Sequence, residues 1–190
     1  MVKIFCEGSD DKKLIMKLLE HLKSESKIID VNNVHFQQII LSPTKNFHGK
    51  DSILSEDYFN EIILKREKLL KVKKVLFLLD CDNINKNQKC GGCENTKKCL
   101  DKIKNLIQQK YPEIKIEYFL FNDNLEKYLL NTLADDIKNC FNDFTNCIQI
   151  ENNKVIYSIY KGLYPNQPFD FSHQNFDELK NKLIWLFKGE

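Results

Sequence analysis

The chain has 190 residues, of which 42% are hydrophobic and 29% are charged, and its formal net charge is +2. These values are typical of an ordinary globular protein with one sizeable core. No apolar run approaches the roughly 20 residues of a membrane span, and the start of the chain lacks the long apolar region of a signal peptide. We therefore expect a cytoplasmic protein that has no membrane partner.

The charges and the cysteines add two expectations. Basic and acidic residues are interspersed along the chain, so the net charge permits nucleic acid as a partner without indicating it. The seven cysteines are odd in number and irregularly spaced. This pattern favours reduced thiols over a disulfide framework in a cytoplasmic chain.

Hydrophobic periodicity predicts a sequence of alternating strands and helices. In chain order these are a strand at 2–6, a helix at 11–23, a strand at 34–41, a helix at 58–70, a strand at 75–79, a helix from 95 to Pro112, a strand at 114–121, a long amphipathic helix at 125–141, and helices at 152–162 and 176–187. Strands that alternate with helices imply a parallel sheet with crossover helices. The alternating residues at 114–119 indicate an edge strand.

The pattern changes after residue 122, where only helices are predicted. We expect an α/β domain over residues 1–130, with a cysteine-containing insertion at 84–99. Residues 131–190 are expected to form a helical extension packed on the same domain, because no linker separates the two parts.

Two acids follow the most hydrophobic of the predicted strands. Five consecutive apolar residues at 75–79 indicate a strand buried on both faces inside a parallel sheet. Side chains alternate along a strand, so Asp80 and Asp82 are expected to point to one side and Cys81 to the other. Mg²⁺ suits such a pair, because it takes oxygen ligands and usually binds one or two protein carboxylates. The structural alternative is a turn, in which Asp and Asn are common.

The first predicted strand also ends in an acidic turn. Glu7 and Gly8 follow it, and the next helix has Ser9 or Asp10 as its expected N-cap. Gly8 would permit a sharp turn after Glu7. Glu7 would then lie at the carboxyl edge of the sheet, where open α/β sheets bind ligands.

Together the two strand ends resemble the motifs of the Toprim domain superfamily. Residues 5–11, Phe-Cys-Glu-Gly-Ser-Asp-Asp, resemble the first motif, and residues 77–83, Phe-Leu-Leu-Asp-Cys-Asp-Asn, resemble the second. Residues 49–53, Gly-Lys-Asp-Ser-Ile, are similar to a Gly-Lys segment in the Toprim domain of OLD-family nucleases. The resemblance covers residues 1–130 and implies a Toprim-like, Rossmann-like fold with a mostly parallel four-stranded sheet flanked by helices. The rest looks like the tail of small stand-alone Toprim-related bacterial proteins.

The resemblance implies a Mg²⁺- or Mn²⁺-dependent site for phosphodiester chemistry on nucleic acid. Glu7 would act as general acid or base or share the metal, and Asp80 and Asp82 would be metal ligands. Asp11 matches a frequent acidic position, and Glu126 lies where OLD-type members carry another acid. Either of these two is also explained as an acid in the first turn of a helix. A metal held by carboxylates would stabilise the charge that grows on the attacking and leaving oxygens.

The chain also departs from the well-known members of this superfamily. The tyrosine domain of topoisomerases, the ATPase of OLD proteins and the helicase or zinc domain of primases are not recognised in it, so a topoisomerase is not expected. The first hypothesis is a nuclease or nucleotidyl-transfer protein. The second is an inactive module that binds nucleic acid or a partner ATPase. The third is an Asp-x-Asp phosphatase, although Ile84 stands where those enzymes usually have Thr.

A cysteine segment carries a second metal prediction. Cys90, Cys93 and Cys99 have the spacing C-x2-C-x5-C, with two glycines inside the first pair, which is typical of half a zinc knuckle. A complete zinc site needs a fourth ligand, for which Cys81 and His48 are the candidates. The alternatives are a loop with reduced thiols and a redox pair.

Overall fold

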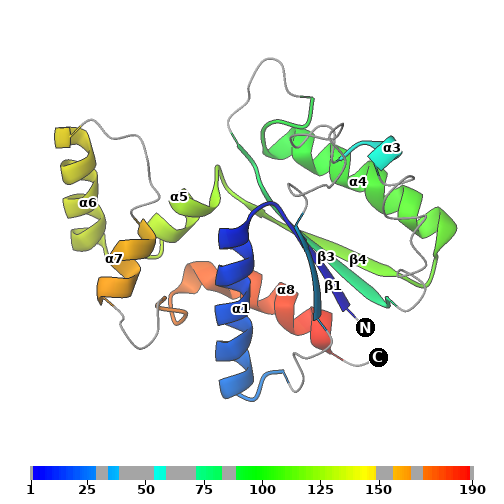
Figure 1. Ribbon diagram of the computed structural model, residues 1–190, viewed down its shortest axis with the longest axis horizontal. Helices are drawn as coiled ribbons and strands as arrows, with labels where there is room; N and C mark the ends of the chain where they lie inside the picture. The colour runs from blue at the N-terminus through cyan, green and yellow to red at the C-terminus, as the bar shows by residue number, and fades with distance from the viewer. Residues whose placement is uncertain are drawn as a thin grey trace.

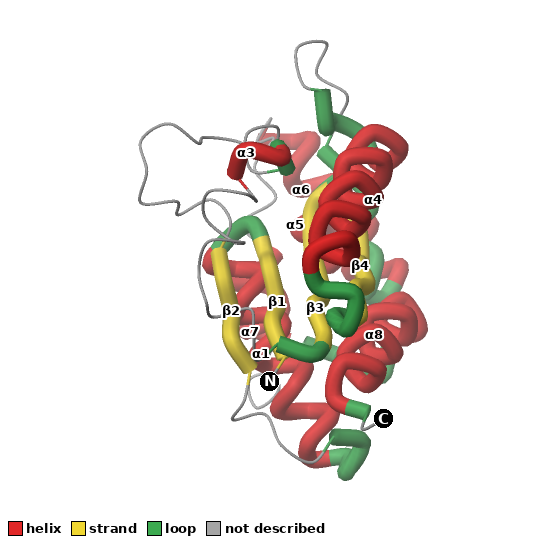
Figure 2. Tube along the Cα trace, turned by 90° about the vertical axis from the view of Figure 1, so that its right-hand side faces the viewer, coloured by secondary structure: helices red, strands yellow, loops and turns green. Residues whose placement is uncertain are grey.

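The computed structural model describes residues 2–28, 34–38, 54–58, 72–82, 89–148, 156–163 and 169–188. Over these residues the chain forms a mixed α/β fold in which helices flank a parallel sheet (Figure 1 and Figure 2). The α/β class and the parallel sheet predicted from the sequence are therefore confirmed.

The sheet has the strand order β2-β1-β3-β4, and every neighbouring pair is parallel. Its strands are β1 (Val2–Cys6), β2 (Val34–Gln38), β3 (Lys74–Asp80) and β4 (Lys115–Phe121). β1 and β3 take the two central positions, and β4 lies at an edge, as its alternating sequence predicts. Because the strands run the same way, the residues that follow β1 and β3 meet at the carboxyl edge of the sheet.

Helices cover both faces of this sheet. The helices of the described residues are α1 (Ser9–Ser24), α3 (Glu56–Tyr58), α4 (Cys93–Lys110), α5 (Leu125–Leu130), α6 (Asp135–Ile148), α7 (Ile156–Leu163) and α8 (Asp177–Phe187), with a 3-10 turn at Gln174–Phe176. Figure 1 shows α1 and α8 on one face and α4 on the other, while α5, α6 and α7 extend to the left of the sheet. Within the described residues, no helix combines the length and the apolar character needed to cross a membrane.

Alternate side chains of β3 enter two separate cores. Leu76 and Leu78 belong to the core that contains residues of α1 and α8. Val75, Phe77 and Leu79 belong to the core that contains residues of α4. Each of the five is at most 1% exposed, which confirms that this strand is buried on both faces.

The C-terminal helices complete the core on the α1 face. Leu179, Leu183 and Leu186 of α8 are at most 1% exposed and share that core with Leu14 of α1. The part of the chain after residue 130 therefore packs directly on the sheet and its helices.

The single helix predicted over residues 125–141 is wrong, because two helices cover this stretch. α5 ends at Leu130 and α6 begins at Asp135. Thr132, which is 2% exposed, explains the break. Both its backbone N–H and its hydroxyl donate to the carbonyl oxygen of Leu129, and these bonds close a turn in place of a further helical turn.

The N-cap predicted for α1 is also wrong. The helix begins at Ser9 and its N-cap is Gly8, not Ser9 or Asp10. The Asp11 carboxylate accepts a hydrogen bond from the Gly8 N–H at 2.6 Å, so the helix is capped from its third residue. Gly8 has φ −123°, an extended conformation open to any residue, so the turn does not depend on a glycine.

Other helix ends differ little from the prediction, and some predictions cannot be compared. α4 begins at Cys93, α7 spans Ile156–Leu163 and α8 begins at Asp177. Several predicted features lie partly or wholly outside the described residues: the end of the strand at 34–41, His48, the Gly-Lys segment at 49–53, most of the helix at 58–70, the start of the insertion at 84–99, and the start of the helix at 152–162.

Candidate functional site

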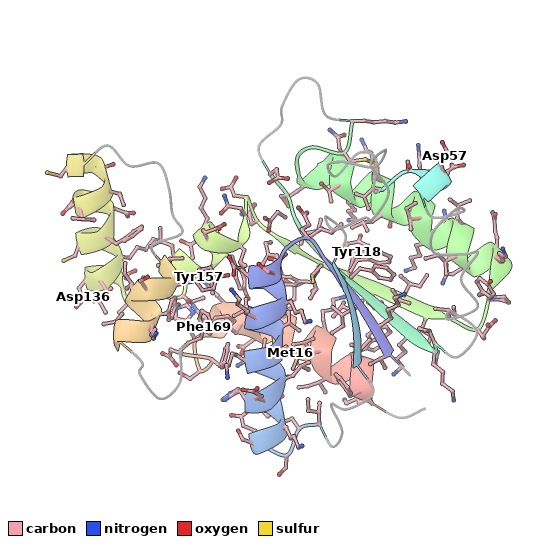
Figure 3. The ribbon with its side chains drawn as sticks, viewed as in Figure 1. Met16, Asp57, Tyr118, Asp136, Tyr157 and Phe169 are labelled. Atoms are coloured by element: carbon pink, nitrogen blue, oxygen red, sulfur yellow. A yellow bond between two sulfur atoms is a disulfide. The ribbon has the colours of Figure 1, made fainter. Side chains whose placement is uncertain are left out.

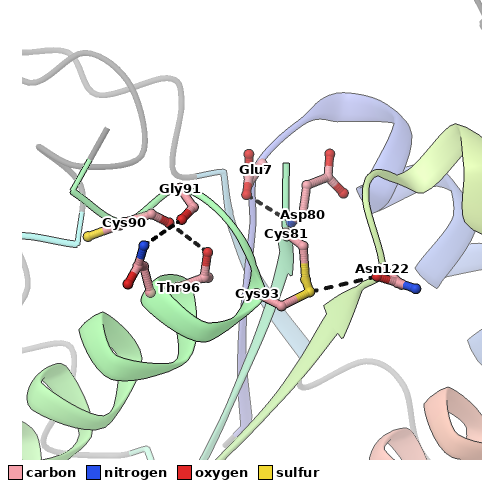
Figure 4. The surroundings of a disulfide bond; sticks show 9 residues. Glu7, Asp80, Cys81, Cys90, Gly91, Cys93, Thr96 and Asn122 are labelled. Carbon is pink, nitrogen blue, oxygen red and sulfur yellow. Dashed lines mark hydrogen bonds between the residues drawn. A yellow bond between two sulfur atoms is a disulfide. The ribbon is translucent and has the colours of Figure 1, made fainter. Parts of the chain in front are cut away.

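The side chain of Glu7 meets the end of β3. Glu7 directly follows β1, and Asp80 is the last residue of the neighbouring strand β3. The Glu7 carboxylate oxygen Oε1 accepts a hydrogen bond from the Asp80 backbone N–H at 2.9 Å. Figure 4 shows both side chains at the strand ends, with this hydrogen bond as a dashed line between Glu7 and the backbone of Asp80. The structure therefore brings together the two strand ends that the sequence singled out.

Asp11 brings a third carboxyl group close to the turn after β1. Its side chain is 5% exposed, and burial raises its pKa to about 6. The negative charges of Glu126 and Asp10 raise this pKa further, while the hydrogen bonds from backbone N–H groups oppose the rise. Glu126 lies in the first turn of α5, after the end of β4, and Asp11 lies in the first turn of α1, after the end of β1, so both acids follow strands that end at the carboxyl edge.

Asp82 lies two residues beyond the end of the strand, and its backbone leaves the extended conformation on which the alternation of side chains depends. β3 ends at Asp80, and Asp82 has φ 52°, in the left-handed region that L-residues rarely adopt. Its backbone N–H donates to the carbonyl oxygen of Asp123 at 2.6 Å, and the Cys81 N–H donates to that of Phe121 at 2.9 Å. These two bonds fasten the exit of β3 to the exit of β4.

A metal site is not preassembled in the described part of the chain. Among the described residues, no three His, Cys, Asp or Glu side chains lie close enough together to hold a metal ion. The Glu7 carboxylate is bonded to the backbone N–H of Asp80, whereas Asp82, Asp11 and Glu126 form no ligand set with that pair. A cation would have to draw further carboxylate oxygens toward the pair.

The expectation of reduced thiols is wrong for four of the seven cysteines. Disulfides link Cys81 to Cys93 and Cys90 to Cys99. The alternation of β3 explains the first bond, because a side chain at position 81 continues the row that faces α4, and Cys93 is the first residue of α4. The free cysteines are Cys6, which is buried, and two exposed residues of α6, Cys140 and Cys147.

The pairing of these cysteines bears on the zinc prediction. Zinc binds cysteine as the thiolate, so a site built from Cys90, Cys93 and Cys99 would form only after both disulfides are reduced. In Figure 4 the sulfur atom of Cys90 points away from the bond between Cys81 and Cys93. Zinc binding stays a prediction for the reduced chain.

The C-terminal part places a tyrosine near the acids. Tyr157 lies in α7, and Figure 3 shows it close to the N-terminal end of α1. Its hydroxyl oxygen is buried. Its pKa is raised, first by burial and then by the carboxylates nearby, which are those of Asp10, Asp11, Glu126 and Asp80. No local signal in the sequence marks this residue, because only the packing of α7 on the domain brings it to the acidic edge, by which we mean Glu7, Asp11, Asp80, Asp82 and Glu126 at the carboxyl end of the sheet.

Comparisons with known proteins give no relative for this chain. No family model, curated protein or solved structure matches it. The function of the chain is therefore inferred from the residues at the carboxyl edge.

Proposed function

We propose that this chain is a Mg²⁺- or Mn²⁺-dependent protein of the Toprim type, a nuclease or nucleotidyl-transfer protein that acts on nucleic acid. The observation that carries the proposal is the hydrogen bond between the Asp80 N–H and the Glu7 carboxylate. It joins the ends of two adjacent central strands, from the backbone of the segment that resembles the second Toprim motif to the Glu7 side chain of the first. Such a strand-end edge is where open α/β sheets bind ligands.

The side chains at this edge fit a hard divalent cation. Glu7, Asp80 and Asp82 offer carboxylate oxygens, which are the ligands that Mg²⁺ prefers. When bound, the cation would stabilise the negative charge on the attacking and leaving oxygens of a phosphodiester. In this proposal Asp80 and Asp82 are ligands, Glu7 carries a proton or shares the cation, and Asp11 and Glu126 supply further negative charge.

Calorimetric titration with Mn²⁺ tests the proposed cation site. We expect the double variant Asp80→Asn, Asp82→Asn to lose Mn²⁺ binding, because amide oxygens carry no net charge and a divalent cation is held mainly by charged carboxylates. The control variant Asp101→Asn, Asp143→Asn has the same change in net charge at two exposed positions of α4 and α6. It should bind Mn²⁺ as the wild type does. Circular dichroism checks that each variant is folded.

Incubation of labelled DNA and RNA oligonucleotides with Mg²⁺ or Mn²⁺ then tests the chemistry. Cleavage or extension that disappears in the Asp80→Asn, Asp82→Asn variant supports the proposal. Mn²⁺ affinity that survives in that folded variant contradicts it, because the cation would then bind elsewhere.

A module without catalytic activity, which binds nucleic acid or a partner ATPase, is the second candidate. It is favoured by one observation, namely that the described residues contain no preassembled group of three metal ligands. Such a module would retain the oligonucleotides in a mobility-shift experiment and leave them uncut in both metals.

A further inference from the structure

The hydroxyl of Tyr157 is a buried polar group on which the charges of the nearby acids act. Its oxygen has no hydrogen-bond partner within the part of the chain that the structure describes. Buried polar groups in folded proteins nearly always have a partner, either in the protein or in bound water or ligand. Among the described residues, the hydroxyl of Tyr157 therefore lacks the partner that a bound molecule would supply.

The ring of Tyr157 is held in place by packing. It belongs to the partly buried side chains that pack against the core of the α1 face. Its ring meets that of Phe169 edge-on, with 6.0 Å between the ring centroids and an interplanar angle of 84°. The hydroxyl is therefore carried on a fixed ring, and a change that removes only the oxygen leaves this packing intact.

The Tyr157 phenol is a hydrogen-bond donor next to carboxylates that are acceptors. An ionised carboxylate only accepts hydrogen bonds, whereas a neutral phenol donates one. The acids that influence Tyr157 are those of the proposed cation site and its surroundings: Asp10, Asp11, Glu126 and Asp80. A phosphate group bound through a cation presents further negative oxygens, which need donors.

We infer that Tyr157 is a ligand-binding residue of this edge and that its hydroxyl donates a hydrogen bond to a phosphate oxygen of bound nucleic acid. The inference rests on the proposed function and adds a residue of the C-terminal helices to the site. A tyrosine phenol is neutral at physiological pH, so Tyr157 acts as a hydrogen-bond donor and not as a nucleophile.

Two binding measurements on the full chain separate this role from a structural one. The first is the affinity for Mn²⁺, measured by calorimetry. The second is the affinity for labelled single-stranded DNA and RNA of one sequence, measured by fluorescence anisotropy once with Ca²⁺ and once without it. The variant Tyr157→Phe keeps the ring and removes the donor. The control Tyr160→Phe removes a buried hydroxyl of the same helix that donates to the Leu129 carbonyl oxygen at 3.0 Å. Thermal unfolding shows whether each variant is folded.

We expect Tyr157→Phe to bind Mn²⁺ as the wild type does, because a phenol is not one of the cation's ligands. Its Ca²⁺-dependent affinity for at least one oligonucleotide should fall about tenfold or more, as loss of a hydrogen bond to a charged group predicts. Tyr160→Phe should retain both affinities.

Three outcomes would overturn the inference. Oligonucleotide affinity that is unchanged in Tyr157→Phe removes the donor role and leaves the proposed function standing. Loss of Mn²⁺ affinity in a folded Tyr157→Phe variant makes the tyrosine a support of the cation site and not a phosphate donor. A wild type that binds neither Mn²⁺ nor the oligonucleotides contradicts the proposed function, and the inference falls with it.

Discussion

Asp11 shows how one buried carboxyl group links the stability of the fold to its site. Its carboxylate caps α1 by accepting a hydrogen bond from the Gly8 N–H, and the negative charge of Glu126 raises its pKa. Its pKa in the folded chain is about 6, against about 3.9 in an unfolded chain. The folded chain therefore takes up a proton between pH 6 and pH 4 that the unfolded chain does not. The stability that comes from this proton is present below about pH 4 and is lost as the pH rises through about 6.

We expect Asp11→Asn to remove this pH dependence. The Asn side chain at position 11 is neutral at every pH. The free energy of unfolding of the variant relative to the wild type should therefore rise between pH 4 and pH 7, by an amount on the order of 2–3 kcal/mol. Urea denaturation of both proteins at the two pH values measures the change. Asp10→Asn, one residue away and more exposed, controls for the loss of a charge near the start of the helix. A difference between Asp11→Asn and wild type that stays constant with pH would contradict the assignment.

At the scale of elements, Lys74 fastens the last helix to the sheet. It is the first residue of β3 and is 7% exposed. Its Nζ donates to the carbonyl oxygens of Trp185 at 2.8 Å and Lys188 at 2.6 Å, and it lies 5.1 Å from the centre of the Trp185 indole ring. The last carbonyls of a helix have no donor within the helix, and a positive charge is favourable there. A buried lysine thus serves as the C-terminal cap of α8.

We expect Lys74→Met to lower the free energy of unfolding by about 2–3 kcal/mol, because it fills similar space but leaves the α8 carbonyls without their charged donor. Lys73→Met is the matched control, since the neighbouring Lys73 is exposed. Urea denaturation measures both variants. Equal stability of Lys74→Met and Lys73→Met would show that water replaces the lysine without cost.

At the scale of the whole molecule, the core on the α1 face is built from both ends of the chain. Leu14 and Leu18 of α1 share it with Phe176, Leu179 and Leu183 near the C-terminus, and each of these five is fully buried. α8 also contacts β3 and β4. The helices after residue 130 are therefore part of the structure that supports the strand ends.

We expect a chain truncated after residue 168 to lose cooperative unfolding. Removal of one large buried apolar side chain costs about 2–5 kcal/mol, so loss of several exceeds the 5–15 kcal/mol that stabilises a typical domain. Thermal unfolding followed by circular dichroism, with a dye that binds exposed apolar surface, measures the effect. A chain that lacks only residues 189–190 is the control. A sharp transition at the wild-type temperature in the truncated chain would show that the N-terminal part folds alone.

Local pattern was enough to predict the elements whose burial is regular. The five apolar residues of β3 and the alternation in β4 correctly predict a central and an edge strand. The break at Thr132 was missed, because its hydrogen bonds to Leu129 compete with a helical periodicity that continues across them. The partners of Cys81 and the place of Tyr157 could not be predicted, because each depends on how α4 and α7 pack and not on neighbours in sequence. Glu7 and Asp80 could be paired in advance, because both follow parallel strands of one sheet.

The two disulfides interleave along the chain, since Cys90 lies between Cys81 and Cys93, and Cys93 lies between Cys90 and Cys99. A protease that cuts any one peptide bond from residue 81 to residue 99 therefore leaves both fragments covalently joined. Cleavage before Cys90 is bridged by the first disulfide, cleavage after Cys93 by the second, and cleavage between these two by both. While the bonds are intact, a nicked chain would keep the end of β3 and the body of α4 in a single molecule. The acidic edge could thus outlast damage to the backbone beside it.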